Sequence, residues 1–106
     1  MITKAQQKIV DARVERGIEW LNKKVPDWHK KIVFKNLDMS HYKVCICGQI
    51  FGEYEDANLS NSNAMSKGFL ASDNLYSYEQ NEYYENLEAT WIKRIREIRK
   101  KLKDKA

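Results

Sequence analysis

The apolar residues in the last quarter of the chain follow the spacing of an α-helix. They recur every three or four positions, at Tyr84, Leu87, Trp91, Ile95, Ile98 and Leu102. This spacing places all six side chains on one face of a helix. Ser77 stands three residues before Gln80, which is the pattern of a capping box at a helix start. The pattern therefore predicts a long helix over about residues 77–102, whose apolar stripe the rest of the chain must cover.

A second helical pattern occupies the start of the chain. Its apolar residues are again three or four positions apart, at Val10, Val14, Ile18, Leu21 and Val25. Thr3 and Gln6 form another capping-box pattern, and Pro26 disfavours helical geometry at the residue before it. We therefore expect a helix over about residues 4–24, followed by a short helix over about 26–32 that Pro26 can begin. The two long helices are expected to pack antiparallel, around a core that includes Trp20, Trp28, Phe51 and Trp91.

The middle of the chain gives weaker patterns. We expect residues 33–39 to be extended and to place four apolar side chains in the core, namely Val33, Phe34, Leu37 and Met39. Asp38 or Ser40 is expected to cap the element that follows. Residues 43–51 fit a helix that ends at Gly52 and fit a buried strand equally well, so both remain open. Residues 53–76 are polar and rich in turn-forming residues, which favours a loop with one helical turn within 64–70.

Together these patterns predict one mostly α domain spanning residues 1–106, a small helical bundle with long first and last helices. Composition agrees, because 42% hydrophobic and 32% charged residues are typical of a folded globular domain. No apolar run is long enough to span a bilayer, and the N-terminus lacks the apolar core of a secretory signal. We therefore expect a cytoplasmic protein.

Charge is distributed unevenly along the chain. The net charge is +4, yet residues 1–51 carry +5, residues 52–91 carry −7, and the basic helix end and tail over 92–106 carry +6. Segments of opposite sign attract one another, so the chain as a whole is not uniformly suited to nucleic acid.

Cys45 and Cys47 are separated by one residue, which is too close for a relaxed disulfide. With His29 and His41 they match zinc in ligand type, but their spacing differs from that of known zinc sites. Buried thiols behave as small hydrophobic groups, so core packing is the favoured interpretation. The chain also lacks the common phosphate-binding and hydrolase motifs. We expect no metal, no cofactor and no enzymatic activity.

Four short motifs form a distinctive set: Arg16-Gly17-x-x-Trp20-Leu21, Pro26-x-Trp28, Leu37-Asp38-Met39 and Cys45-x-x-Gly48-Gln49-x-Phe51-Gly52-x-Tyr54. Together with Trp91 on the last helix, they resemble a group of short uncharacterised phage and prophage proteins. In that group a Cys-x-x-Gly-Gln-x-x-Gly core follows a Trp-rich helical start. Cys47 departs from the pattern, where an aliphatic residue is expected. The resemblance implies a phage-type accessory protein, a class in which small binders of host machinery are common, and it assigns no catalytic residue.

Tyrosines and carboxylates gather at the start of the last helix, and tyrosine is favoured in protein interfaces. The predicted partner-binding residues are Tyr76, Tyr78, Glu79, Glu82, Tyr83 and Glu85. We expect them to bind and modulate or inhibit a host protein, in a defence (anti-CRISPR-like) or nucleic-acid-handling complex.

The alternative is a small nucleic-acid-binding regulator. It would use basic residues that point away from the apolar stripe, at Lys93, Arg96, Lys100 and Lys103. Both faces also have a structural interpretation, because tyrosines can cover the edge of a core and basic side chains stabilise a helix C-terminus.

Overall fold

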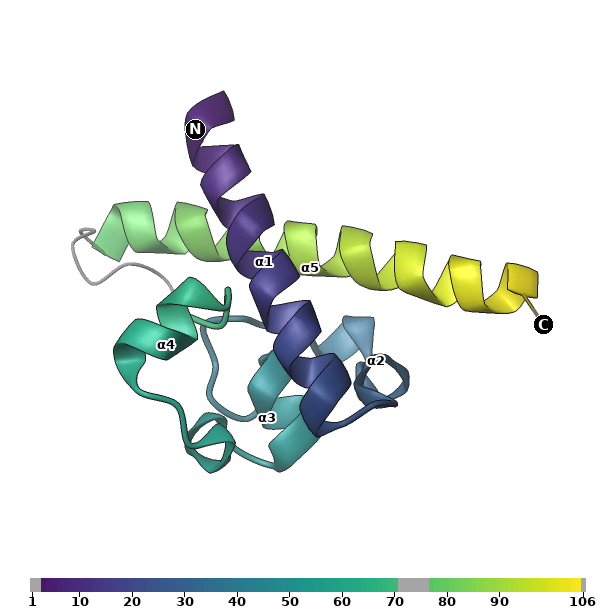
Figure 1. Cartoon of the computed structure of the whole chain (residues 1–106). Coiled ribbons are helices and arrows are strands. Elements are labelled where there is room, and N and C mark those ends of the chain that lie inside the picture. The colour runs from purple at the N-terminus through teal and green to yellow at the C-terminus, as the bar shows by residue number, and fades with distance from the viewer. Residues whose placement is uncertain (1–2, 71–76, 106) are drawn as a thin grey trace.

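A computed structural model describes the backbone of residues 3–70 and 77–105, and the side chains of 3–70 and 82–104. The described chain forms five α-helices: α1 (Lys4–Lys24), α2 (Trp28–Lys31), α3 (Ile46–Phe51), α4 (Asn61–Ser66) and α5 (Ser77–Lys105). Two short 3₁₀ helices, η1 (Phe34–Asn36) and η2 (Tyr54–Ala57), lie between them, and the described residues contain no strand (Figure 1). The predicted fold class, a mostly α bundle with long first and last helices, is confirmed.

The first helix begins and ends as its sequence predicts. The Thr3 hydroxyl accepts a hydrogen bond from the Gln6 backbone N–H at 3.1 Å, and the Thr3 N–H donates to the Gln6 side chain at 2.9 Å. This capping box satisfies two backbone groups that a helix start leaves without partners. The helix stops at Lys24, with Val25 as its cap before Pro26.

The two long helices cross rather than lie alongside each other, so the predicted antiparallel packing is wrong (Figure 1). Their described contacts run from Gln7, in the first turn of α1, to Gly17. The Gln7 amide donates to the Thr90 hydroxyl at 3.2 Å, and Gly17 lies against Trp91. The C-terminal half of α1 covers the short helices instead, and these occupy the space that an antiparallel neighbour would need. Leu102 lies beyond the crossing, and 47% of its surface is exposed although it belongs to the predicted stripe.

The core is built around the buried indole of Trp91. This ring stacks on Phe69 with the centroids 5.5 Å apart, and it meets the ring of Trp28 edge-on at 5.9 Å. Both indole N–H groups have partners, since Trp91 donates to the Gly68 carbonyl at 2.7 Å and Trp28 to the Asn22 side chain at 2.8 Å. Aromatic rings in such stacked and edge-on pairs add stabilisation beyond the area that they bury.

The ambiguous segment 43–51 contains the helix α3 over Ile46–Phe51, which a turn precedes. Cys45 is its N-cap, with the sulfur accepting a hydrogen bond from the Gly48 N–H at 3.3 Å, and Gly52 ends it with a φ of +106° that suits glycine. A side chain at Gly48 would meet the carbonyl oxygen of Tyr42 at 2.6 Å. Glycine at this position therefore permits the turn before α3 to pass close to the helix, and does not indicate a strand.

The connection between α2 and α3 differs from its prediction. Leu37 and Met39 are buried as expected, but Val33 is 49% exposed, because the chain turns through η1 instead of staying extended. Asp38 does not cap a helix either. Its carboxylate accepts hydrogen bonds from the N–H and the hydroxyl of Ser40, which closes a local turn.

The helical turn expected within 64–70 lies earlier in the chain. It is α4, whose N-cap Ser60 accepts a hydrogen bond from the Asn63 N–H at 3.2 Å. The cap explains the shift, because Ser60 provides the acceptor that a helix start requires. The residues after α4 instead bring Phe69 into the core.

Substituting Gly17 with alanine should destabilise the protein. The added Cβ would collide with the carbonyl oxygen of Lys67 and lie 2.9 Å from the Trp91 ring. Overpacking of this kind costs about 1–3 kcal/mol, although alanine has the better helix propensity by about 1 kcal/mol. Urea denaturation should therefore give a lower midpoint for Gly17→Ala, while Lys8→Ala, at an exposed position of the same helix, should change the unfolding free energy by less than about 0.5 kcal/mol. An unchanged midpoint for Gly17→Ala would contradict the close packing at the crossing.

Candidate functional site

The predicted partner-binding residues occupy the first turns of α5, and only some have described side chains. Tyr76 lies outside the described residues, and Tyr78 and Glu79 are described as helix backbone alone. Tyr83 has less free surface than the sequence suggested. Its ring packs against the core, and its hydroxyl accepts a hydrogen bond from the Arg13 guanidinium at 2.6 Å. Tyr83 therefore holds α5 against α1.

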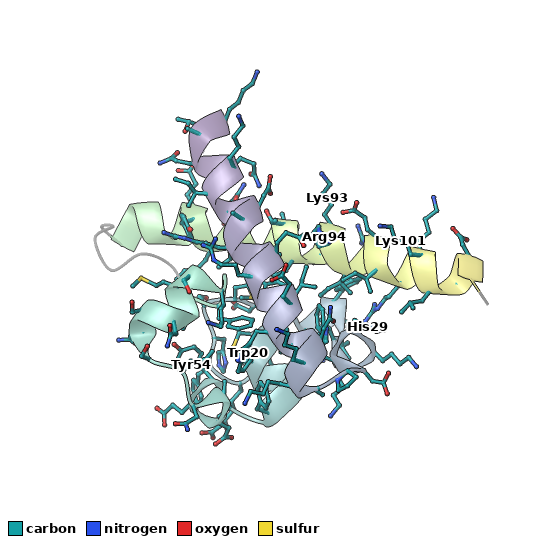
Figure 2. All side chains as sticks on the ribbon, in the orientation of Figure 1. Trp20, His29, Tyr54, Lys93, Arg94 and Lys101 are labelled. Carbon is teal, nitrogen blue, oxygen red and sulfur yellow. The ribbon has the colours of Figure 1, made fainter. Side chains whose placement is uncertain are left out.

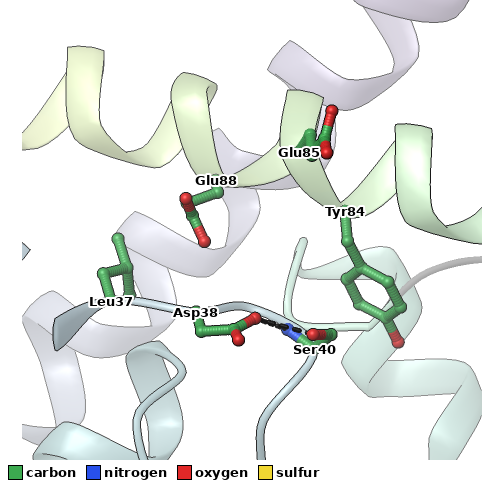
Figure 3. Close-up of a pocket in the computed structure, with 6 residues that line it drawn as sticks. All are labelled: Leu37, Asp38, Ser40, Tyr84, Glu85 and Glu88. Atoms are coloured by element: carbon green, nitrogen blue, oxygen red, sulfur yellow. Dashed lines mark hydrogen bonds between the residues drawn. The ribbon is translucent and has the colours of Figure 1, made fainter.

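An open cleft lies on the other flank of α5, between this helix and residues 37–40 (Figure 3). Its volume is about 380 Å³. The residues that line it are Leu37, Asp38, Ser40, Tyr84, Glu85 and Glu88. Three of them are carboxylates and none is basic, so the cleft has a negative potential. We call it the acidic cleft.

The carboxylates of the acidic cleft are held in different ways. Glu88 accepts a hydrogen bond from the Met39 backbone N–H at 3.2 Å, and this bond joins α5 to the segment that forms the opposite wall. The hydrogen bonds from Ser40 lower the pKa of Asp38, so this carboxylate is ionised at neutral pH. Glu85 is exposed at the rim.

This arrangement suits a cationic side chain. A lysine or arginine that entered the cleft would find carboxylate acceptors and, beside them, the ring of Tyr84 for its aliphatic part. Figure 3 shows the Tyr84 side chain extending from α5 toward the same opening. Of the residues that line the cleft, the sequence singled out only Glu85. It did not point to Asp38, Tyr84 or Glu88, because nothing in their spacing indicates that residues 37–40 lie beside α5.

The basic residues of α5 divide into two groups. Lys93, Arg96, Lys100 and Lys103 are exposed, as the sequence predicted. Arg99 instead turns inward, where its guanidinium donates to the carbonyls of His29 at 2.5 Å and Ile32 at 2.6 Å. These carbonyls lie at the end of α2, so Arg99 satisfies groups that a helix end leaves without partners. Arg99 also lies over the Phe34 ring, 4.6 Å from its centroid.

The cysteines and histidines do not form a reactive site. Cys45 and Cys47 are buried, and burial raises the pKa of both thiols. Burial is also the main cause that lowers the pKa of His29, and this residue lies edge-on to Trp28. His41 accepts a hydrogen bond from the Lys43 N–H and stacks on Tyr42. Within the described part of the chain, no three His, Cys, Asp or Glu side chains are placed to hold a metal ion.

Comparison of the chain with protein-family models, with curated proteins and with solved structures gave no match. In the described ranges, no helix combines the length and apolar character needed to cross a bilayer.

We expect Arg99 to stabilise the folded protein and its neighbour Lys100 to contribute little to stability. Arg99→Met removes the donors to two carbonyls at the end of α2, and hydrogen bonds to a charged group contribute about 1.5–3 kcal/mol. We expect the unfolding free energy to fall by about 2 kcal/mol in urea denaturation. Lys100→Met, which removes the same charge at an exposed position, should change it by less than about 0.5 kcal/mol. Equal effects of the two substitutions would contradict this role for Arg99.

The two thiols should be unreactive while the protein is folded. Raised pKa values keep Cys45 and Cys47 protonated at pH 8, and burial blocks access to the sulfur atoms. Ellman's reagent should label both thiols quickly in guanidinium chloride and at least about 100-fold more slowly in buffer. The folded state favours the neutral thiols, so their contribution to stability should be complete below about pH 8.5 and should decline as the pH rises further. A thiol that reacts in buffer at the denatured rate would show that it is accessible.

Proposed function

We propose that the protein is a non-enzymatic binding protein that recognises a basic side chain of a partner protein in the acidic cleft. The observation that carries this proposal is that three carboxylates, those of Asp38, Glu85 and Glu88, line one cleft together with Tyr84. These residues come from two segments far apart in sequence, and a hydrogen bond between Glu88 and Met39 holds the segments together. A prearranged cleft of this kind reduces the entropy lost on binding.

The resemblance to phage and prophage proteins suggests the biological setting. In this proposal the chain is encoded by a phage or prophage and acts in the host cytoplasm, where it binds and modulates or inhibits a host protein. Proteins of defence and nucleic-acid-handling complexes suit the cleft, because surfaces that contact phosphates are rich in lysine and arginine. A protein that binds such a surface through its acidic cleft would compete with nucleic acid for the same basic side chains.

The second candidate function is nucleic-acid binding by α5. The exposure of Lys93, Arg96, Lys100 and Lys103 supports it, because all four are available to phosphates. The Phe34 ring lies beside one of the four, but it is already in contact with the guanidinium groups of Arg96, 5.4 Å from its centroid, and Arg99, 4.6 Å from it. Binding through this face would therefore depend on charge alone and would be independent of base sequence.

One experiment separates the two candidates. The tagged full-length chain is used to capture proteins from a bacterial lysate, alongside the double variant Asp38→Asn/Glu85→Gln. This variant removes two negative charges from the cleft with little change of shape, and the control variant Glu53→Gln/Glu55→Gln removes two at exposed positions elsewhere. We expect a partner that is retained by the wild type and the control and is reduced at least about tenfold with the cleft variant, since each lost charged hydrogen bond costs about 1.5–3 kcal/mol.

The second arm measures the mobility of labelled DNA and RNA with the same three proteins at low and high salt. Salt-sensitive retention that the cleft variant leaves unchanged would favour the nucleic-acid function instead. A protein partner that binds all three chains equally would contradict the acidic cleft as the binding site.

A further inference from the structure

A second, smaller cleft adjoins the acidic cleft. Its volume is about 110 Å³, and it shares two lining residues with the acidic cleft, Ser40 and Tyr84. In the view of Figure 3, these two residues lie on the side of the acidic cleft opposite Leu37. The two clefts are therefore neighbours, with Ser40 and Tyr84 between them. We call the smaller one the apolar cleft, and the two together the paired clefts.

The apolar cleft is lined mainly by aromatic and aliphatic side chains. Met39 and Phe69 belong to its lining and are buried in the core, whereas Tyr42, which also lines it, is 52% exposed. The apolar cleft therefore leads from the surface to the core. None of its described lining residues is an aspartate, glutamate, lysine or arginine. An apolar side chain that entered it would leave water and extend the packing of the core.

The volume of the apolar cleft limits what it can hold. An enclosed apolar cavity of about 150 Å³ accommodates a benzene ring. The apolar cleft, at about 110 Å³, is smaller than such a cavity. It therefore suits an aliphatic side chain such as leucine, valine or methionine, and it is too small for an indole.

Charge distinguishes the two clefts. Asp38, Glu85 and Glu88 line the acidic cleft and attract a cation. The Lys43 ammonium lies 5.7 Å from the centroid of the Tyr42 ring, so a positive charge borders the apolar cleft. A basic side chain is therefore attracted to the acidic cleft and repelled from the apolar one. Each cleft favours a different kind of side chain.

We propose that the paired clefts bind an extended segment of a partner protein that carries a lysine or arginine and, two residues away, an aliphatic side chain. This inference rests on the proposed function, because the basic residue occupies the acidic cleft. In an extended chain the side chains of residues i and i+2 point to the same face, about 7 Å apart. Two such side chains can enter neighbouring clefts, with Ser40 and Tyr84 between them.

A protein segment fits the paired clefts better than other occupants. A nucleic acid would be repelled by three carboxylates, and a small cation would leave the apolar cleft filled with water. Figure 2 shows Lys93 and Lys101 on α5, apart from Tyr54, which lines the apolar cleft. The basic face of α5 is therefore separate from the paired clefts, so binding at the two places can be distinguished.

The test follows NMR chemical shifts of the isotope-labelled full-length chain during titration with synthetic peptides. The parent peptide is Gly-Ser-Arg-Ala-Leu-Ser-Gly with both termini blocked. One variant peptide has glutamine in place of the arginine, and another has serine in place of the leucine. We expect the parent peptide to shift the amide signals of residues 38–42 and 84–88. Its dissociation constant should be at least about fivefold lower than that of the serine peptide, because burial of an aliphatic side chain strengthens binding by about tenfold or more.

Substitutions in the protein assign each peptide side chain to its cleft. Tyr42→Ala removes part of the apolar cleft, so it should weaken the parent peptide at least about fivefold and the serine peptide by less than about twofold. Asp38→Asn/Glu85→Gln should weaken the parent peptide at least about tenfold and the glutamine peptide by less than about twofold. The control Ile9→Ala removes an apolar side chain of similar exposure, 50%, from α1 and should leave all dissociation constants unchanged. Circular dichroism of each variant verifies that the helices are retained.

The outcomes separate this inference from the proposed function. If the arginine strengthens binding and the leucine does not, or if Tyr42→Ala binds the parent peptide like the wild type, the acidic cleft remains a binding site and the inference is overturned. If no peptide shifts the signals at about 2 mM, where weak binding is still detected, both are overturned. Sedimentation velocity of the chain alone tests a second copy as the occupant. A dimer that Tyr42→Ala dissociates would overturn the inference, because the segment would then belong to the chain itself.

Discussion

Burial of Trp91 at the point where α1 crosses α5 is the packing interaction that the rest of the fold depends on. The indole lies against Gly17 of α1, where any side chain would prevent the approach. The same ring stacks on Phe69, meets Trp28 edge-on and donates its N–H to the Gly68 carbonyl. A single side chain therefore joins the first helix, the α2 region and the segment after α4. In a chain of 106 residues the core is small, so one large aromatic residue contributes much of the buried apolar area.

The crossing also determines which surfaces remain available. Antiparallel helices would have covered each other along their whole length, whereas crossed helices cover each other over only part of it. The C-terminal half of α5 consequently projects from the body, with Leu102 nearly half exposed. Two arginines attach this half of α5 to the rest of the protein. Arg94 pairs with Glu15, and Arg99 donates hydrogen bonds to carbonyl groups at the end of α2. These two arginines are structural, whereas Lys93 before them and Lys100, Lys101 and Lys103 after them are exposed.

The acidic residues also divide into some that stabilise the fold and some that are exposed. Glu88 and Asp38 hold the segment at residues 37–40 in place through backbone hydrogen bonds. Glu85 is exposed at the rim of the acidic cleft. In the proposed function it would contact a basic side chain of the partner.

The sequence by itself determined the two long helices, their capping at Thr3 and their apolar stripes, because these depend on interactions within a few residues along the chain. It also identified Lys93, Arg96, Lys100 and Lys103 as outward-facing, since helical periodicity alone separates them from Trp91. Only the tertiary structure decided that the helices cross, that Ile46–Phe51 is a helix, and that Arg99 and Tyr83 serve the fold. It likewise decided that Asp38 lies beside α5 to form the cleft. Each of these depends on contacts between residues far apart in sequence, and neither the spacing of apolar residues nor local propensity contains that information.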